Sequence, residues 1–323
     1  MCRNGKLYIV FAVPYNVERA QKNTAGMVEE VQFMRYTLGW STSVGEASRR
    51  DERSAYDKHL RGMEGDPMKV VILAGGFGTR ITEESHLKPK PMIEIGEQPI
   101  LWHIMKYYSE FGFNDFIICL GYKQYVVKEY FADYFLHTSD VTFDLANNRM
   151  EVHRKHAEPW KVTLVDTGLY TMTGGRVKRI REYTEGEPFM LTYGDGVSDV
   201  DLNALLKFHK EHGKIATLTT VNIGQAKGVL DVAPDGQIRS FREKDDSDGT
   251  LINGGFMVFE QGIFDYLKDD TTVLEQEPFR RLTADGEMAG YCHKGFWQCM
   301  DTQREKKRLE ELWQSGKAPW KIW

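Results

Sequence analysis

A glycine-rich segment followed by two cations offers the chemistry for binding phosphate. Residues 73–80 read Leu-Ala-Gly-Gly-Phe-Gly-Thr-Arg, and residues 88–91 read Lys-Pro-Lys-Pro. Glycines let the backbone turn and let amide N–H groups approach an anion closely. Arg80 and Lys90 add positive charge that the neutral amides lack. The segment therefore predicts a site for a nucleotide polyphosphate. We expect its contacts to come from Leu73, Ala74, Gly75, Gly76, Phe77, Gly78, Thr79, Arg80 and Lys90.

Two familiar phosphate loops do not fit this segment. A Walker loop requires Lys and then Ser or Thr after its last glycine, whereas Thr79 and Arg80 follow Gly78. A dinucleotide fingerprint requires a third glycine, and the chain has Ile81 there. A plain strand-to-loop turn stays open as an alternative, but the added Lys90 favours a dedicated phosphate site.

Two carboxylates are candidates for holding a divalent cation. Asp195 stands between Gly194 and Gly196 after an apolar run, and Asp301 follows an aromatic run that we expect to be buried. Mg²⁺ prefers carboxylate oxygens together with phosphate and water. The alternatives are a tight Asp-Gly turn for Asp195 and a buried ion pair for Asp301. We predict that both bind Mg²⁺, with Gly194 beside the nucleotide.

Four further polar residues could contact the substrates. Lys244 suits a sugar phosphate, although a solvated charged turn explains it nearly as well. Asn253 precedes two glycines and suits sugar hydroxyls, with a β-bulge or hairpin as the alternative. Thr171 and Arg176 lie near the start of an expected helix, whose N-terminus favours anions. We expect these two to contact a base or a phosphate.

The elements that must position these residues alternate along the chain. Strands alternating with helices predict a doubly wound, mostly parallel α/β sheet, followed by a β-rich portion for sugar binding. Ligands of such sheets bind at the carboxyl ends of the strands, where the glycine-rich loop and Asp195 would both lie. The expected strands are 70–73, 116–120, 141–144, 162–166, 189–193, 216–221, 229–232, 238–241 and 256–259. The expected helices are 100–111, 124–135, 174–183, 202–212 and 304–313.

Composition excludes several classes of protein. The chain has 323 residues and a formal net charge of −5, which argues against a nucleic-acid-binding protein. Its 4 cysteines lack disulfide-framework or metal spacing, so we expect a reduced, cytoplasmic protein. No apolar run has the length of a membrane span. Residues 1–67 are expected to be an extension, disordered or not native to the domain, with a docked arm or oligomer contact as the alternative. The domain then covers 68–323.

At this level of detail the chain resembles the sugar-1-phosphate nucleotidylyltransferases, the enzymes that make nucleotide-sugars. The general marks are LAGGFGTR and KPKP. More specific segments resemble the branch of the family that makes CDP-glucose. These are KPKPMIEIG, PILWHIMK, VKEYFADYFLH, EPWKVTLVDTG, MTGGRVKR, TYGDGVSD, INGGF, GFWQCMDT and GKAPWKIW. Together they extend over essentially all of residues 68–323.

The resemblance implies a reaction and a set of roles. The cytidylyl group of CTP would pass to α-D-glucose 1-phosphate, giving CDP-glucose and pyrophosphate for bacterial O-antigen or surface-polysaccharide 3,6-dideoxyhexose synthesis. Arg80, Lys90 and Asp195 would be catalytic, and Asp195 and Asp301 would bind Mg²⁺. Family members are homo-oligomers, so the resemblance implies one here, with a hexamer as one form. No nucleic acid or membrane partner is expected.

Other functions stay open at this point. One departure from the family pattern is Asp245 after Lys244, where relatives carry proline, and the first 67 residues have no counterpart. Uridylyl- or thymidylyltransferases share the general marks. A nucleotide-sugar glycosyltransferase would share the fold, but it usually carries an Asp-x-Asp motif and lacks the glycine-rich loop. A non-catalytic nucleotide-sensing subunit would be expected to lose the charged residues that persist here.

Overall fold

The computed structural model describes residues 68–323 apart from 80, 82–83, 85, 156, 223–228, 233–236 and 243–250. The expected extension, residues 1–67, lies outside the described residues. Among the described residues no helix combines the length and the apolar character that a membrane span requires.

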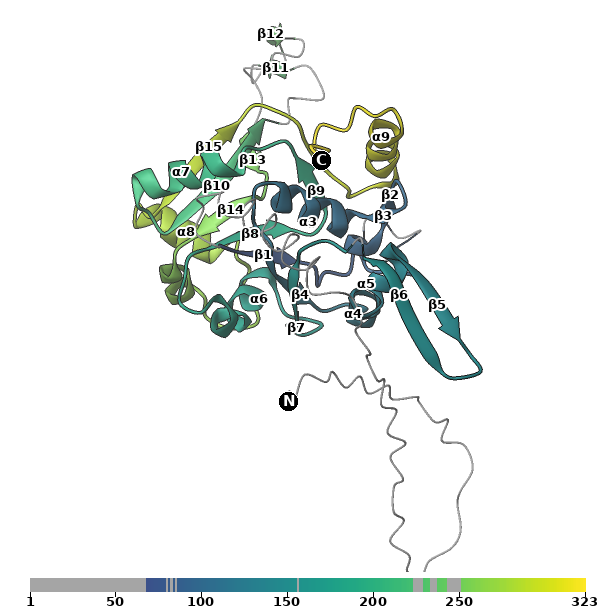
Figure 1. The fold of residues 1–323 in the computed structure, drawn as a ribbon. Helices are drawn as coiled ribbons and strands as arrows, with labels where there is room; N and C mark the ends of the chain where they lie inside the picture. The colour runs from purple at the N-terminus through teal and green to yellow at the C-terminus, as the bar shows by residue number, and fades with distance from the viewer. Residues whose placement is uncertain are drawn as a thin grey trace, which may run out of the picture.

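A mixed, mostly parallel sheet of 8 strands forms the centre of the fold (Figure 1). Its order is β13-β10-β14-β8-β1-β4-β7, and β15 pairs with β10. Strands β8, β1, β4 and β7 run parallel, whereas β14 is antiparallel to β8 and β10 is antiparallel to both β13 and β14. This confirms the predicted doubly wound α/β fold. The strands are β1 (Lys69–Leu73), β4 (Asp115–Leu120), β7 (Lys161–Asp166), β8 (Phe189–Tyr193), β10 (Ala216–Asn222), β13 (Leu251–Asn253), β14 (Met257–Phe259) and β15 (Met288–His293).

Helices cover both faces of this sheet. Side chains alternate between the two faces along each strand, so an apolar strand has apolar side chains to bury on both. In β1, Val70 and Ile72 join a core with residues of α3, α7 and α9. Val71 and Leu73 point the other way and join a core with residues of α6 and α8. Strands that are buried on both faces read as continuous apolar runs, as β1 does. The helices are α3 (Ile100–Glu110), α4 (Gln124–Ala132), α5 (Tyr134–Thr138), α6 (Thr173–Arg179), α7 (Leu202–His212), α8 (Glu277–Ala284) and α9 (Gln303–Gln314).

Local sequence signals define α7 at both ends. The side chain of Asp201 accepts a hydrogen bond from the backbone N–H of Ala204, which is an N-cap. Gly213 follows the last turn with a φ of 64°, a conformation that glycine adopts without strain. The predicted helix 202–212 is therefore confirmed at both bounds.

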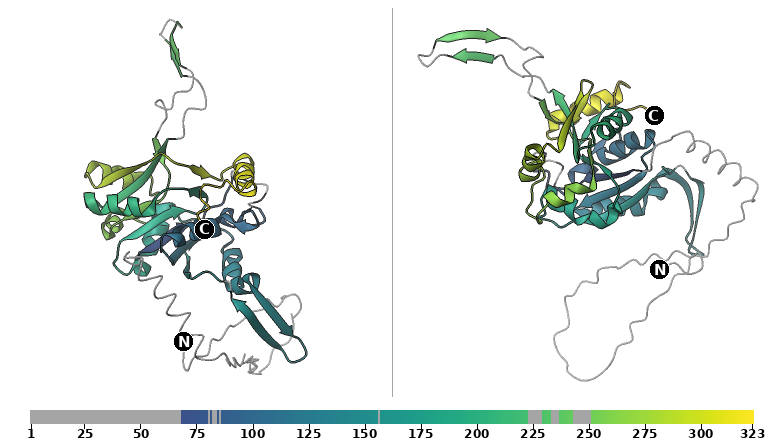
Figure 2. Two further views of the ribbon diagram at one scale, coloured as in Figure 1. Left: turned by 45° about the horizontal axis from the view of Figure 1, so that its top comes forward. Right: turned by 90° about the vertical axis from the view of Figure 1, so that its left-hand side faces the viewer.

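Smaller strand pairs and 3₁₀ turns surround the main sheet. A hairpin of β5 and β6 projects away from it beside α5 (Figure 2). Strands β9 and β16 form a separate antiparallel pair. The remaining elements are β2 (Glu94–Ile95), β3 (Gln98–Pro99), β5 (Ser139–Asp144), β6 (Arg149–Lys155), β9 (Gly196–Ser198), β11 (Val229–Val232), β12 (Ile238–Arg242), β16 (Trp297–Cys299), η1 (Lys90–Met92), η2 (Arg181–Thr184) and η4 (Gln261–Tyr266).

Two predicted helices were wrong in their extent. The single helix expected over 124–135 is divided at Asp133, whose φ of −101° and ψ of 6° fall outside the α-helical region. The helix expected over 174–183 ends at Arg179 and continues as the 3₁₀ turn η2. Periodicity alone does not register such breaks.

Candidate active site

Lys90, Asp195 and Asp301 meet at one point. The Nζ atom of Lys90 donates to Asp195 Oδ2 at 2.5 Å and to Asp301 Oδ1 at 2.6 Å. The lysine side chain is 11% exposed and the carboxylates are 29% and 21% exposed, so the group can be reached from solvent. Two acidic residues far apart in the sequence are thereby brought to a single cation. The sequence left two interpretations of Asp301 open, a buried ion pair or a cation site shared with Asp195. The observed geometry is compatible with both.

The backbone pairing of β9 with β16 explains why the two aspartates lie together. Cys299 pairs with Gly196 in that ladder, and one step further the Met300 N–H donates to the Asp195 carbonyl at 2.9 Å. Asp195 precedes β9 and Asp301 follows β16, so each carboxylate leaves the same end of the pair. Their proximity is therefore set by main-chain hydrogen bonds and does not depend on Lys90 alone.

Lys90 reaches the carboxylates from η1, a 3₁₀ turn with Pro91 near its start. A Cβ built on Gly194 would lie 3.0 Å from the Leu73 carbonyl oxygen and 3.1 Å from Pro91 Cγ, so the glycine permits this close packing. Burial opposes the charge on Lys90, but attraction and hydrogen bonds from Asp195 and Asp301 outweigh it and raise the lysine pKa. The lysine therefore stays an ammonium at neutral pH.

The glycine-rich loop begins where β1 ends, beside this charged group. Its first glycine is closely packed: the Gly75 carbonyl accepts from the Tyr122 N–H at 3.2 Å and from Arg176 Nη2 at 3.0 Å. A Cβ on Gly75 would lie 2.2 Å from Arg176 Nη1, and one on Gly121 would lie 2.6 Å from the same atom. Both glycines are therefore required to admit the guanidinium.

The rest of the loop is open. A Cβ on Gly76 would meet nothing within 4 Å, and Gly78 has a φ of 65°. Phe77 is 41% exposed and packs its ring near Tyr122. Among the described residues, no backbone acceptor is found for the N–H groups of residues 76–79. With respect to the described part of the chain, these amides are available to solvate an anion.

The buried Arg176 side chain contacts the glycine-rich loop through the Gly75 carbonyl. Its guanidinium donates to the carbonyls of Leu120 at 3.0 Å and Gly168 at 2.8 Å, and to the Thr167 hydroxyl at 2.7 Å. Burial lowers the pKa of Arg176 below its ordinary value. The side chain is 5% exposed and lies behind the loop. Its direct contact with a base or phosphate stays a prediction.

Thr171 is buried near the turn that leads into α6. A Cβ on Gly168 would lie 2.6 Å from its hydroxyl oxygen. The neighbouring Tyr170 is 80% exposed, and its ring packs against Phe77 of the loop. Thr171 therefore lies close to the glycine-rich loop but deeper than its aromatic neighbour.

A second polar network extends from the same end of β8. Tyr193 donates its hydroxyl proton to Glu275 at 2.7 Å and accepts from Asn253 Nδ2 at 3.1 Å. The side-chain oxygen Oδ1 of Asn253 accepts from the Gly255 N–H at 3.0 Å. The Thr173 hydroxyl donates to the other carboxylate oxygen of Glu275 at 2.6 Å. Burial and the charge of Glu275 raise the pKa of Tyr193. Asn253 is thus oriented beside Tyr193, two residues before Asp195.

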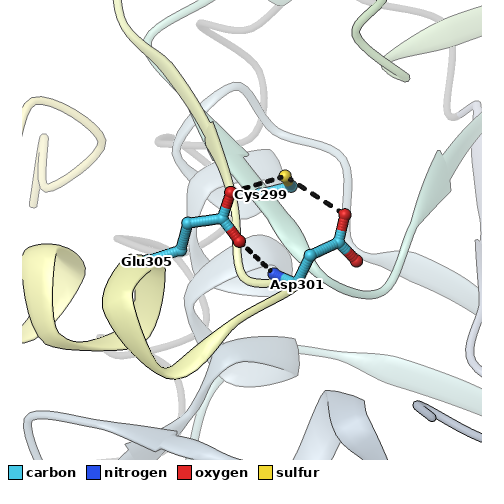
Figure 3. Close-up of side chains that lie close together, drawn as sticks. All are labelled: Cys299, Asp301 and Glu305. Atoms are coloured by element: carbon cyan, nitrogen blue, oxygen red, sulfur yellow. Dashed lines mark hydrogen bonds between the residues drawn. The ribbon is translucent and has the colours of Figure 1, made fainter. Parts of the chain in front are cut away.

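Two residues beside Asp301 were not identified from the sequence. Cys299 Sγ lies 3.6 Å from Asp301 Oδ2 and 3.9 Å from Glu305 Oε1, and Glu305 Oε2 accepts from the Asp301 N–H at 2.8 Å (Figure 3). Burial, followed by the charges of Glu305, Asp301 and Asp195, raises the pKa of Cys299 to about 12. The pattern Thr302-x-x-Glu305 is a capping-box signature and could have indicated Glu305. Nothing in the sequence singled out Cys299.

The remaining predicted site residues divide into two groups. Arg80 and Lys244 lie outside the described residues. Leu73, Ala74 and Thr79 lie in or beside the loop, and Ala74 donates its N–H to the Cys119 carbonyl at 3.0 Å.

The donor set around Lys90 fits a divalent cation. Two carboxylates, one just before β9 and one just after β16, converge on one point that already holds a positive charge. Oxygen donors of this kind are the ligands that Mg²⁺ and similar hard cations accept. Residues 76–79 follow β1, whose carboxyl end lies beside that of β8, the strand that leads to Asp195.

Comparison with known proteins finds similarity over most of the chain. Residues 69–302 match the family model described as nucleotidyl transferase. The glucose-1-phosphate cytidylyltransferase of Salmonella typhimurium is 60% identical over 257 residues, which are 79% of this chain and 100% of that protein. A UTP–glucose-1-phosphate uridylyltransferase of Synechocystis is 28% identical over 62% of this chain and 51% of that protein.

Solved structures show the same fold at low sequence identity. HddC from Yersinia pseudotuberculosis has a TM-score of 0.57 at 22% identity, covering 76% of this chain and 99% of its own. An apo UDP-glucose pyrophosphorylase also has a TM-score of 0.57, at 15% identity, covering 78% of this chain and 100% of its own.

Proposed function

Because the chain belongs to the nucleotidyl transferase family, we propose that it transfers the cytidylyl group of CTP to α-D-glucose 1-phosphate, giving CDP-glucose and pyrophosphate. The observation that carries the proposal is the Lys90 ammonium held between Asp195 and Asp301 beside an open glycine-rich loop. CTP is favoured over UTP because the cytidylyltransferase relative is 60% identical and the uridylyltransferase relative is 28% identical.

The reaction joins two anions, so positioning and charge neutralisation supply most of its catalysis. The amides of residues 76–79 bind the triphosphate, and Arg80 adds charge to the same segment. Lys90 neutralises charge as the phosphate oxygen of glucose 1-phosphate attacks the α-phosphorus in line. The bond from that phosphorus to the bridging oxygen breaks, and pyrophosphate leaves with the electron pair.

Asp195 and Asp301 hold the divalent cation, which we propose is Mg²⁺. When bound there it neutralises negative charge on the phosphates of the nucleotide. The two carboxylates share the Lys90 ammonium, and Lys90 would be available to phosphate if a divalent ion supplied positive charge at this point instead. Gly194 keeps this point close to the loop, because its N–H donates to the Leu73 carbonyl at 3.0 Å.

The remaining site residues take supporting roles. Thr171 lies beside the nucleotide, and Arg176 fixes the loop by donating to the Gly75 carbonyl. Asn253, oriented by Tyr193, binds sugar hydroxyls, and Lys244 binds the phosphate of the sugar.

A pyrophosphate-release assay tests the proposal. The full chain is given glucose 1-phosphate and Mg²⁺ with CTP, UTP or dTTP in parallel, and we expect release chiefly with CTP. An Asp195→Asn variant is the matched control, because asparagine has nearly the same shape without the charge. No release with CTP would overturn the proposal, and equal release with all three nucleotides would remove its base specificity.

The wider role is proposed on the same basis. We place the reaction in the cytoplasm, in the supply of CDP-glucose for bacterial O-antigen or surface-polysaccharide 3,6-dideoxyhexose synthesis. We also propose a homo-oligomer, with a hexamer as the expected form, and the domain as residues 68–323 with 1–67 an added extension. Light scattering of the full chain and of a chain that begins at Met68 would test both statements.

A further inference from the structure

We infer that Glu305 is a positioning residue that, together with Cys299, holds the Asp301 carboxylate in place for metal binding. The inference rests on the proposed metal role of Asp301 and deepens it. Neither Glu305 nor Cys299 contacts Lys90 or Asp195 in the hydrogen bonds described above, so both act through Asp301.

Glu305 lies in the first turn of α9 and carries one side of a capping box. The Thr302 hydroxyl accepts from the Glu305 N–H at 3.3 Å, and Glu305 Oε2 accepts from the Thr302 N–H at 2.8 Å. Such reciprocal bonds satisfy two backbone donors and fix the helix start.

The same Glu305 oxygen does more than an ordinary capping box requires. It also accepts from the backbone N–H of Asp301 at 2.8 Å, one residue before the cap. The peptide that carries Asp301 is therefore tied to α9, a helix of 12 residues that packs Leu309 into the core. A helix start alone would need only the bond to Thr302.

Cys299 fixes the other end of the same residue. Its Sγ lies 3.6 Å from Asp301 Oδ2, while Asp301 Oδ1 faces Lys90 at 2.6 Å. The thiol proton is a weak donor, and the shorter of its two contacts is the one to Asp301. The two carboxylate oxygens thus have different partners, which fixes the rotation of the carboxylate.

Fixing both the backbone and the carboxylate matters because a metal ligand must already be oriented when the ion arrives. Groups that orient a ligand typically change metal affinity by about 10- to 100-fold when they are removed. Strand β16 supplies Cys299 and helix α9 supplies Glu305, so Asp301 is held from the two elements that flank it.

The test measures metal affinity and stability separately on the full chain. Mn²⁺ binding to nucleotide-free protein is followed by electron paramagnetic resonance of the free ion, and the melting temperature is recorded for each variant. We expect Glu305→Ala to weaken Mn²⁺ binding about tenfold or more. Glu305→Gln keeps a carbonyl acceptor and should bind Mn²⁺ nearly as the unaltered protein does.

Thr302→Ala is the matched control for helix stability. It removes the hydroxyl of the capping box but leaves Glu305 free to accept from the Asp301 N–H. We expect its melting temperature to fall as that of Glu305→Ala does, with Mn²⁺ affinity unchanged. Equal Mn²⁺ affinity in the Glu305→Ala and Thr302→Ala variants would overturn the inference.

Three further variants separate the possible failures. Asp301→Asn must itself lose most Mn²⁺ affinity, since unchanged binding there would refute the proposed metal role and not only the positioning. Cys299→Ala should weaken Mn²⁺ binding about two- to threefold, as expected for one weak hydrogen bond. Cys299→Ser, which keeps a donor, should restore it. Identical affinity in these two cysteine variants would exclude Cys299 from the inference.

Discussion

Asp195 and Asp301 flank a single pair of strands, and the carbonyl of Asp195 accepts the backbone N–H of the residue that precedes Asp301. Their carboxylates share the Lys90 ammonium. The acidic pair is therefore assembled by main-chain pairing and then bridged by a lysine from a different part of the fold, which offsets one of the two negative charges. The charges of Asp195, Asp301 and Lys90 can therefore be removed one at a time, each by a single substitution.

Removing either carboxylate charge should cost turnover more than stability. We expect Asp195→Asn and Asp301→Asn each to lower kcat for pyrophosphate release by about 10²- to 10³-fold, the usual effect of losing one preorganised electrostatic contact. The circular dichroism spectrum should be unchanged. Turnover within a factor of three of the unaltered protein in either variant would contradict the metal assignment.

In the absence of metal, removing the Lys90 charge should lower the stability of the fold. Lys90→Met leaves two partly buried carboxylates facing each other, so we expect the free energy of unfolding to fall by about 1–3 kcal/mol. Added Mg²⁺ should restore part of that loss, because it replaces the missing charge.

Lys88→Met is the control for that experiment. Lys88 pairs with Glu94 at 2.6 Å, but the glutamate is 52% exposed, and such surface pairs contribute about 0–1 kcal/mol. Urea titrations of the two variants with and without Mg²⁺ measure the difference. A loss in Lys90→Met that Mg²⁺ does not reduce would argue that the site does not exchange the ammonium for a metal.

Neighbouring glycines of the loop should respond differently to one added methyl group. Gly75→Ala would place Cβ 2.2 Å from Arg176 Nη1, so the guanidinium or the loop must move. We expect the free energy of unfolding to fall by about 1–3 kcal/mol, as for other overpacked sites.

Gly76→Ala meets nothing within 4 Å and should unfold at nearly the same urea concentration as the unaltered protein. It narrows the open side of the loop, so the KM for CTP should rise. Equal destabilisation by the two substitutions would show that Gly75 is not constrained by Arg176.

The environment of two histidines, His209 and His212, lets us predict how stability depends on pH. His209 Nδ1 and His212 Nε2 both lie 2.7 Å from the Thr217 hydroxyl oxygen, and His209 Nε2 lies 3.3 Å from Glu260. Lys214 donates its backbone N–H to His212 Nδ1 at 3.0 Å. Because that nitrogen accepts, His212 donates from Nε2 to Thr217, and Thr217 donates in turn to His209. Both rings are neutral in this chain of bonds.

The sign of the pH effect follows from the lowered pKa values. Burial lowers the pKa of His209, which the attraction of Glu260 only partly offsets, and burial and Lys214 lower the pKa of His212. The unfolded chain then binds more protons, so stability is full above about pH 6.5 and is lost as the pH falls below it.

Urea midpoints between pH 7.5 and 5 measure this loss. In His209→Gln the slope should become shallower, because one neutral histidine no longer resists protonation. His153 is exposed, so His153→Gln serves as the control and should leave the slope as it was. A pH slope unchanged in His209→Gln would contradict the assigned direction.

The sequence could predict the parts of the fold that have strong local signals. β1 is a continuous apolar run, and α7 has an aspartate cap and a closing glycine, so both were expected where they lie. β15 was missed because Met288–His293 is a weakly apolar run with half-buried and exposed side chains. β16 was missed because three residues carry too little periodicity to predict a strand.

The site shows the same division between local and tertiary information. The glycine-rich loop, Lys90, Asp195 and Asp301 were identified from short motifs. That Asp195 and Asp301 meet depends on the β9–β16 pairing, which no local pattern encodes. Arg176 was expected at the ligand, whereas its Nη1 and Nη2 atoms donate to the Thr167 hydroxyl and to carbonyls, of which those of Leu120 and Gly75 are distant in the sequence.

The pairing of β9 with β16 has a consequence for how activity returns after denaturation. One acidic group comes from the middle of the domain and the other from near its carboxyl end, so a fragment without either half would lack one of the two proposed metal ligands. Turnover should recover only when the last long-range strand contacts have formed. Recovered enzymatic activity should therefore measure complete refolding, and partly folded intermediates should be inactive.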